Sequence, residues 1–213
     1  ISFLMLEMDQ PGVETRPIKL IAGASPFCET FFNDAQARKD DLLGALNDGW
    51  SVGKRLLQHE RASQTGARPA SNKVSGSLQD LAKAYVGVND QGVLNDADLR
   101  GRIADHLMHT RAHGLTIARI SAEAKGNPEV SAAASILKNS ATRVSQERAE
   151  LTLEFMGHQG VGWEGGDYSE EELEHVRGWL GGKAISIYGG SFEIQNNIIA
   201  KNILGLPETT QKG

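Results

Sequence analysis

Two long stretches with helical periodicity, separated by one short turn, constrain this chain more than any other feature of its sequence. Apolar or small residues recur every three or four positions over about 96–125, and the same spacing returns over about 129–156. Between them, Gly126-Asn127-Pro128 stops a helix. Long helices joined by short turns pack antiparallel, so the sequence predicts a helical bundle. The side chains expected to face inward are Leu99, Ile103, Leu107, Thr110, Gly114 and Ile117 on the first stretch and Leu137, Ala141, Val144, Leu151 and Phe155 on the second.

Strand-like stretches precede this pair, and shorter helical stretches flank it. The first forty residues read as strands around a turn at 9–12, and the periodicity becomes helical after Leu42. Two or three strands are marginal alone, so they should lie on a larger sheet or on helices. The fold class is therefore mainly α, an antiparallel helical bundle preceded by the last strands of a β-domain. Further helices are predicted at about 47–64, 78–86, 169–180 and 190–204.

Charge and composition exclude several classes of function. The formal net charge is −5, which argues against a nucleic-acid-binding surface. No apolar run reaches the length of a membrane span, and no secretory leader pattern is visible. The single cysteine, Cys28, excludes an internal disulfide and favours a reducing compartment. The chain begins at Ile1 inside a strand-like run, so we expect it to be a fragment of a longer protein.

The last apolar run, from Ile187 to Glu208, carries the most distinctive pattern. Gly189-Gly190 interrupts the run, and an apolar helix then closes on a glycine and a proline. Polar side chains follow the glycines at every second position: Ser191, Glu193 and Gln195. This segment resembles the C-terminal pattern of the acyl-CoA dehydrogenase family, where it covers a flavin and the thioester end of an acyl-CoA. The resemblance extends over most of the chain. It implies that residues 1–42 end the central β-domain and that 43–213 form the C-terminal helical domain.

The chemistry of the family requires a base and a hydride acceptor. The base removes a weakly acidic proton beside the thioester carbonyl, and a hydride leaves the adjacent carbon. No side chain accepts hydride, so a flavin or nicotinamide is needed, and the resemblance implies FAD. In many members the base is a glutamate directly after the tyrosine of the C-terminal pattern. Here Gly189 follows Tyr188 and cannot abstract a proton.

Other members of the family place the base on an earlier helix, in a Glu-Arg pair eleven residues after a glycine-aromatic start. This chain has Gly49-Trp50 and then Glu60-Arg61 at that spacing. The resemblance therefore implies that Glu60 is the catalytic base and that Gly189 leaves room for it. From the helix alone, Glu60 reads equally as a solvated carboxylate paired with a neighbouring cation.

The same resemblance implies residues that bind the substrate. Arg61 would lie near the substrate or its CoA moiety, Leu57 would line the acyl channel, and Gly189 and Gly190 would face the thioester. Without the resemblance, Arg61 reads as a partner in a surface ion pair and Leu57 as ordinary core.

Two further segments are expected to bind FAD. After the second long helix, the family carries a Gln-x-x-Gly-Gly loop that holds the diphosphate or adenosine end of FAD from the neighbouring subunit. Glycines there permit close backbone approach to an anion. This chain departs from the pattern, with Glu154 in place of the glutamine and His158 in place of the second glycine. The expected cofactor-binding residues are Glu154, Gly157, His158 and Gly160 in this loop, and Ser191 and Glu193 after the glycine pair. Ser191 also reads as a helix N-cap.

One family motif is absent from the sequence, and one group of histidines is not expected to bind a metal. The family's Arg-x-x-Phe-Gly motif is absent, because the corresponding region reads LAKAYVGVNDQG. A trio of histidines, His106, His109 and His113, shares a helix face at a spacing that can bind zinc. No cysteine lies nearby, so we read the trio as a polar face of the bundle and predict no metal site.

Taken together, the residues and the resemblance predict FAD-dependent α,β-dehydrogenation of an acyl-CoA. The expected partners are the acyl-CoA, an electron-transfer flavoprotein as acceptor, and further copies in a homodimer or homotetramer, with no membrane span. The expected location is the cytoplasm of a bacterium or a mitochondrial matrix. Two alternatives stay open: a non-catalytic partner subunit of a heteromeric dehydrogenase, and an acyl-CoA oxidase-type enzyme. The sequence does not specify the acyl group.

Overall fold

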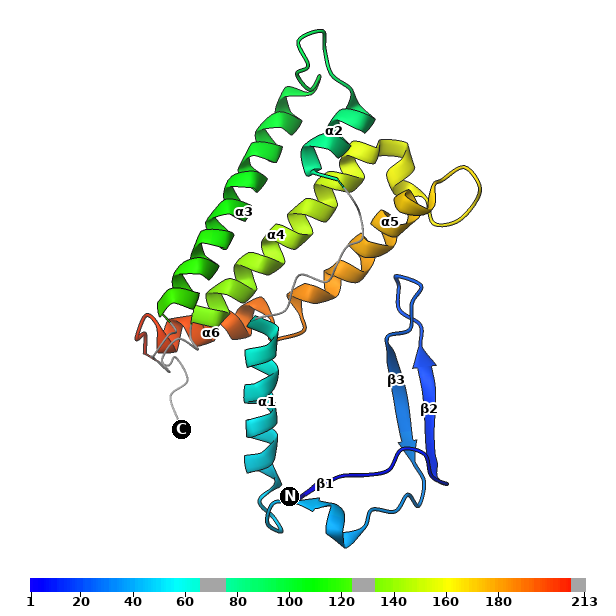
Figure 1. Ribbon diagram of the computed structural model, residues 1–213, viewed down its shortest axis with the longest axis vertical. Helices are drawn as coiled ribbons and strands as arrows, with labels where there is room; N and C mark the ends of the chain where they lie inside the picture. The colour runs from blue at the N-terminus through cyan, green and yellow to red at the C-terminus, as the bar shows by residue number, and fades with distance from the viewer. Residues whose placement is uncertain (66–75, 124–132, 208–213) are drawn as a thin grey trace. The chain divides into compact units, whose positions relative to one another are not determined.

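A computed structural model describes residues 1–65, 76–123 and 133–207 of the chain (Figure 1). Within α1, the side chains of residue 58 and of residues 60–65 lie outside this description. The chain divides into two compact units, Ile1–Ser71 and Asn72–Gly213, and each is described by itself. This division follows compactness in space. The boundary predicted at residue 42 concerns domain membership in the intact protein and stays a prediction.

The first unit consists of two small antiparallel sheets and one helix. β1 (Phe3–Leu4) pairs with β4 (Leu42–Leu43), and β2 (Val13–Ile18) pairs with β3 (Phe27–Phe32). A short 3-10 turn, η1 (Lys39–Asp41), precedes β4, and α1 (Gly49–Thr65) ends the unit.

Gly49 lets α1 begin directly against the N-terminal strand. Its backbone N–H donates to the Ile1 carbonyl at 2.9 Å. A Cβ on Gly49 would lie 2.4 Å from the carbonyl carbon of Ser2, so only glycine fits there.

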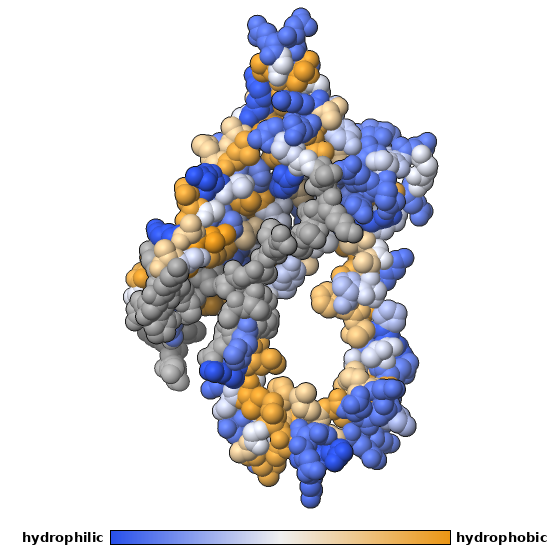
Figure 2. All heavy atoms as spheres, in the orientation of Figure 1, coloured by the Kyte–Doolittle hydropathy of each residue, from blue (hydrophilic) through white to orange (hydrophobic). Residues whose placement is uncertain are grey.

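Large apolar side chains of the first unit remain exposed. Phe27 and Phe32 on the β2–β3 ribbon are 61% and 56% exposed. A second group lies around β1, β4 and the start of α1, where apolar surface is visible in Figure 2: Leu4, Leu43, Leu46 and Trp50. Two-stranded ribbons bury little by themselves.

The second unit is a helical bundle built around α4 (Figure 1). α2, α3, α5 and α6 each pack against α4, which confirms the predicted mainly α fold. The elements are α2 (Leu78–Val86), α3 (Ala97–Glu123), α4 (Ala133–Met156), η3 (Gly157–Val161), α5 (Glu170–Gly182), η4 (Lys183–Ser186) and α6 (Phe192–Asn202). The apolar core comprises Leu78, Ala82, Leu94, Leu99, Ile103, Leu151 and Phe155.

The helices start at side chains that cap them. Ser77, Ser169 and Ser191 accept hydrogen bonds from the third backbone N–H of α2, α5 and α6, and Asp96 accepts from Leu99 N at 2.9 Å. In α5 the cap is reciprocal, because the Glu172 carboxylate accepts from the backbone N–H of Ser169. These caps explain why the predicted helix starts lie close to the observed ones.

The predicted inward stripe of α3 is wrong beyond its first turns. Leu99 and Ile103 are buried, but Leu107 and Ile117 are 38% and 39% exposed. The buried positions continue instead at His106 and Ile120, with His113 half-buried between them. Leu99, His106, His113 and Ile120 repeat every seven residues, which keeps one seam of α3 against α4. The prediction considered only apolar residues, so it omitted the two histidines that occupy inward positions of this repeat.

Candidate functional site

The turn before α6 is shaped by two glycines and one buried amide. Gly189 and Gly190 have φ values of 67° and 89°, a region that favours glycine. The Gln195 side chain is 8% exposed, and its Nε2 donates to the Gly189 carbonyl at 2.6 Å. Among the described residues, none makes a hydrogen bond with the backbone N–H of Gly189 or Gly190. The turn therefore presents two backbone donors next to the start of a helix.

Ser191 and Glu193, both predicted to bind cofactor, lie directly after this turn. Ser191 caps α6, because its hydroxyl accepts from Ile194 N at 3.5 Å, as predicted for a helix N-cap. The nearby Ser191 hydroxyl lowers the pKa of the exposed Glu193 carboxyl group. Lys138 on α4 lies nearby, with Nζ 5.3 Å from the centre of the Phe192 ring. Burial lowers the pKa of Lys138, and its Nζ has no hydrogen-bond partner in the described part of the chain.

The glycine loop after α4 is held by packing. Gly157 ends the helix with a φ of 53°. A Cβ on Gly160 would lie 2.5 Å from the Leu153 carbonyl oxygen, so the packing of η3 against its own helix already requires this glycine. His158 is exposed. Glu154 pairs with Arg102 on α3, and this pairing raises the pKa of Arg102. The carboxylate that replaces the family's glutamine is thus engaged with another helix.

A polar network behind this loop was not foreseen from the sequence. The buried Glu172 carboxylate accepts from the Tyr85 hydroxyl at 3.0 Å, in addition to its cap on α5. The Ser169 backbone N–H, and to a smaller extent the nearby Gln159 side chain, lower the pKa of Glu172. Burial, and then the bond to Glu172, raises the pKa of Tyr85 to about 12. Because Tyr85 and Glu172 lie 87 positions apart, no local pattern could have paired them.

The histidine trio faces α4, where His106 and His109 lie beside Glu147 and His113 lies beside Ser140. His109 Nδ1 lies 3.2 Å from the Glu147 carboxylate, and His113 Nδ1 lies 2.7 Å from the Ser140 hydroxyl. His106 is buried beside Glu147. In the described ranges no group of three or more His, Cys, Asp or Glu side chains is arranged to hold a metal ion.

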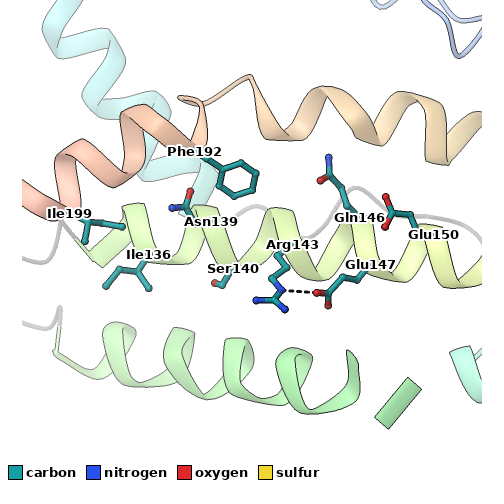
Figure 3. A pocket seen from close by; sticks show the side chains of 9 residues that line it. All are labelled: Ile136, Asn139, Ser140, Arg143, Gln146, Glu147, Glu150, Phe192 and Ile199. Carbon is teal, nitrogen blue, oxygen red and sulfur yellow. Dashed lines mark hydrogen bonds and ion pairs between the residues drawn. The ribbon is translucent and has the colours of Figure 1, made fainter. Parts of the chain in front are cut away.

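A groove of about 560 Å³ runs along α4 (Figure 3). One end is apolar, with Ile136 on α4 and Phe192 and Ile199 on α6. The other end carries Gln146 and the Arg143–Glu147 ion pair at 2.6 Å. None of the sequence-predicted site residues lines this groove.

The remaining predicted residues belong to the first unit. Leu57 on α1 is 45% exposed and is not part of the core of that unit. Glu60 and Arg61 lie on α1, but their side chains fall outside the described residues. The predicted catalytic base therefore belongs to the first unit, and the predicted cofactor-binding residues belong to the second.

Comparison with known proteins identifies the class. A model of the family described as acyl-CoA dehydrogenase, C-terminal domain, matches residues 47–204. This chain belongs to the acyl-CoA dehydrogenase family, which confirms the resemblance drawn from Ile187–Glu208. Acyl-CoA dehydrogenases are FAD-dependent oxidoreductases.

Individual relatives support the same class. The chain is 34% identical to acyl-CoA dehydrogenase IpdE1 of Mycolicibacterium smegmatis over 209 residues, covering 97% of this chain and 49% of that protein. It is 33% identical to IpdE1 of Mycobacterium tuberculosis, covering 97% and 51%. The chain thus spans about half the length of the curated relatives it matches.

Solved structures show the same fold. The ChsE4–ChsE5 complex of Mycobacterium tuberculosis matches with a TM-score of 0.76 and 20% identity, over 98% of this chain and 53% of that chain. A glutaryl-coenzyme A dehydrogenase in complex with glutaryl-CoA matches with a TM-score of 0.71 and 21% identity, over 100% and 52%. In the described ranges, no helix combines the length and apolar character that a membrane crossing needs.

The donors at the α6 turn fit the cofactor that the family uses. A flavin and a thioester both carry oxygen acceptors, and the turn offers two backbone N–H groups that no described residue engages. The Glu193 carboxyl group in this segment lies near the Ser191 hydroxyl, which lowers its pKa. The glycine loop is less informative, because packing alone accounts for Gly160.

Proposed function

We propose that the protein containing this chain is an FAD-dependent acyl-CoA dehydrogenase with Glu60 as the base that removes the α-proton. The proposal rests on the residues found at the two positions where members of the family carry their catalytic glutamate. Gly189 stands where many members have their catalytic glutamate, and Glu60-Arg61 stands where other members have theirs. Membership of the family supports the comparison of both positions with the family pattern.

The roles of the remaining residues follow from the chemistry. When bound, FAD supplies the acceptor for the β-hydride. Glu60 takes the α-proton, and Gly189 has no side chain to obstruct it. As the proton leaves, negative charge develops on the thioester oxygen, where backbone N–H donors of the α6 turn would stabilise it. Arg61 would lie near the substrate or its CoA moiety, Leu57 would line the acyl channel, and Gly157, His158 and Gly160 would approach the FAD of a neighbouring subunit.

Anaerobic flavin reduction tests the proposal. The full-length protein and its Glu60→Gln variant are mixed with a panel of acyl-CoAs, and the visible flavin band is followed. We expect one or more thioesters to bleach the wild-type flavin, and the variant to retain flavin but lose at least about 100-fold in rate. Glu174→Gln, an exposed carboxylate on α5, is the matched control. A Glu60→Gln variant that bleaches at the wild-type rate would exclude Glu60 as the base.

The second candidate is a non-catalytic subunit that pairs with an active chain and helps to bind its FAD. Gly189 and the missing Arg-x-x-Phe-Gly motif favour it, together with a Glu154 that is already engaged by Arg102. A colourless protein that stays colourless when FAD is supplied would support this candidate. Oxygen consumption without an added acceptor would instead support an oxidase. The electron-transfer flavoprotein as acceptor, the homodimer or homotetramer and the cytoplasmic location stay predictions.

A further inference from the structure

The segment from the last residue of α5 to the start of α6 is tied to the bundle through its carbonyl groups. Two side chains of α4 donate to it: Gln146 Nε2 to the Gly182 carbonyl at 3.1 Å, and Thr142 Oγ1 to the Ile185 carbonyl at 3.4 Å. Gln195 on α6 makes a further bond, to the Gly189 carbonyl at 2.6 Å. These bonds fix the orientation of the peptide groups along the segment.

The bond from Gln195 is local to the turn and closely packed. The Gln195 side chain reaches back from the first turn of α6 and is 8% exposed, so its amide needs a partner inside the protein. A Cβ on Gly190 would lie 2.6 Å from Gln195 Nε2. Gly190 thus provides the space that the amide occupies, and Gln195 in turn fixes the peptide between Gly189 and Gly190.

The hydrogen bond from Gln195 to the Gly189 carbonyl also determines the direction of the Gly190 N–H. In a planar trans peptide, the C=O of one residue and the N–H of the next point in opposite directions. Because Gln195 draws the Gly189 carbonyl toward buried side chains, the Gly190 N–H is directed away from them. In the described part of the chain no acceptor meets that N–H.

We propose that Gln195 is a positioning residue, which aims the Gly190 N–H at an oxygen acceptor of the bound ligands. The inference rests on the proposed function, in which the turn faces the flavin and the thioester. The acceptor is an oxygen on either ligand, and the two sources give different results below. Gln195 itself touches neither ligand in this account and acts only through the peptide it holds.

Two Gln195 variants and one control test the inference in the full-length protein. Gln195→Leu removes the donor, and Gln195→Met does the same with an unbranched side chain, so one of the two should fold well. Asn197→Leu removes an exposed amide from the same helix and serves as the control. For each protein we would measure the Kd for FAD, the melting temperature, and the rate of flavin reduction over a range of concentrations of the most active acyl-CoA of the panel.

An acceptor on the thioester predicts a fall of about 10- to 100-fold in the maximal rate of flavin reduction, with KM changed by less than about threefold and the Kd for FAD unchanged. An acceptor on the flavin predicts a Kd for FAD that rises by about tenfold or more. A residue that only stabilises the helix would lower the melting temperature and leave both quantities at wild-type values, which would overturn the inference.

The experiment distinguishes a failure of the proposed dehydrogenase function from a failure of the role proposed for Gln195. If no acyl-CoA reduces the flavin of the wild-type protein, the dehydrogenase proposal fails, and the Kd for FAD alone decides the role of Gln195. Wild-type affinity in both Gln195 variants would then overturn it, whereas weaker binding with a normal Asn197→Leu control would support it.

Discussion

α4 has different surroundings along its two halves. Its C-terminal half buries Leu151, Phe155 and Met156, each at most 4% exposed, in a largely apolar environment. Its N-terminal half buries Ser135 and Thr142 in place of large apolar side chains. Both halves make polar contacts with neighbouring helices, and Glu154 of the C-terminal half pairs with Arg102 on α3. Ser140 hydrogen-bonds His113, Asn139 Nδ2 donates to Asn196 at 2.9 Å, and Nζ of Lys138 has no hydrogen-bond partner among the described residues.

The half of α4 that stabilises the bundle most is therefore not the half that lies near the candidate site. Apolar burial gives the C-terminal half a packed core, whereas polar groups in the N-terminal half contribute little net stability and cost free energy where they lack partners. That polar half supports α6 and the turn that carries Gly189 and Gly190. We infer that large apolar side chains stabilise mainly the C-terminal end of α4, whereas polar side chains lie near the segment proposed to bind ligands.

The largest expected effect is loss of the apolar core at the C-terminal half. Phe155→Ala should lower the free energy of unfolding by about 3–5 kcal/mol, because it removes buried contacts and leaves a cavity. Ile136→Ala, at a half-buried position in the N-terminal half, should cost about 1 kcal/mol. Urea denaturation of both variants measures the contrast. Similar losses at the two sites would mean that the halves of α4 do not differ in this way.

A smaller effect is expected at the polar network beside the glycine loop. Glu172→Ala should lower the free energy of unfolding by about 2 kcal/mol, since it removes the reciprocal cap of α5 and the acceptor of the Tyr85 hydroxyl. Glu171→Ala, the exposed neighbour, should change it by less than about 0.5 kcal/mol. Equal effects in the same urea titration would show that the network does not stabilise the bundle.

How far the sequence predicts this molecule depends on the distance between the residues involved. A start signal such as Ser191 acts within a few residues, so the order of the helices was predictable. The predicted stop at Gly126-Asn127-Pro128 lies outside the described residues. The α3 seam was missed because His106 and His113 take inward positions that a search for apolar residues skips. The Glu172 network joins α2 to α5 and leaves no local trace. The roles of Glu60 and Arg61 came from a family pattern and stay predictions.

The pH dependence of stability should report the buried histidines of the bundle. Burial lowers the pKa of His106, His113 and His175 below the ordinary value of 6.5. His106 faces Glu147, which favours its charged form, and Arg148, which opposes it, and burial outweighs both. The folded state therefore binds fewer protons than the unfolded state, so the contribution is complete above pH 6.5 and is lost as the pH falls toward the lowered values.

Melting temperatures between pH 8 and pH 5.5 test this dependence. The wild-type protein should melt at progressively lower temperature below about pH 6.5. His113→Asn should reduce the slope, whereas His59→Asn, at an exposed position of α1, should leave it unchanged. A slope that His113→Asn does not alter would assign the dependence to other groups.

The smallest expected effect has the opposite sign. Lys138 holds its ammonium where burial lowers its pKa and no described group bonds it, so the charge costs stability in the folded state. Part of that cost is offset by the Phe192 ring and by the nearby Glu193 carboxylate. Lys138→Met keeps the aliphatic stem and removes the charge, so it should raise the free energy of unfolding by up to about 1 kcal/mol at pH 7.

The matched control is Lys83→Met, at an exposed position of α2, which should have almost no effect in the same urea titration. A destabilised Lys138→Met variant would show that the ring and the carboxylate outweigh burial, and the polar half of α4 would then add stability. A stabilised variant would mean that this half carries a charge at a cost to folding, beside the turn where the flavin and thioester are proposed to bind. Lys138 would then be the first residue on α4 to test for an effect on the Kd for FAD.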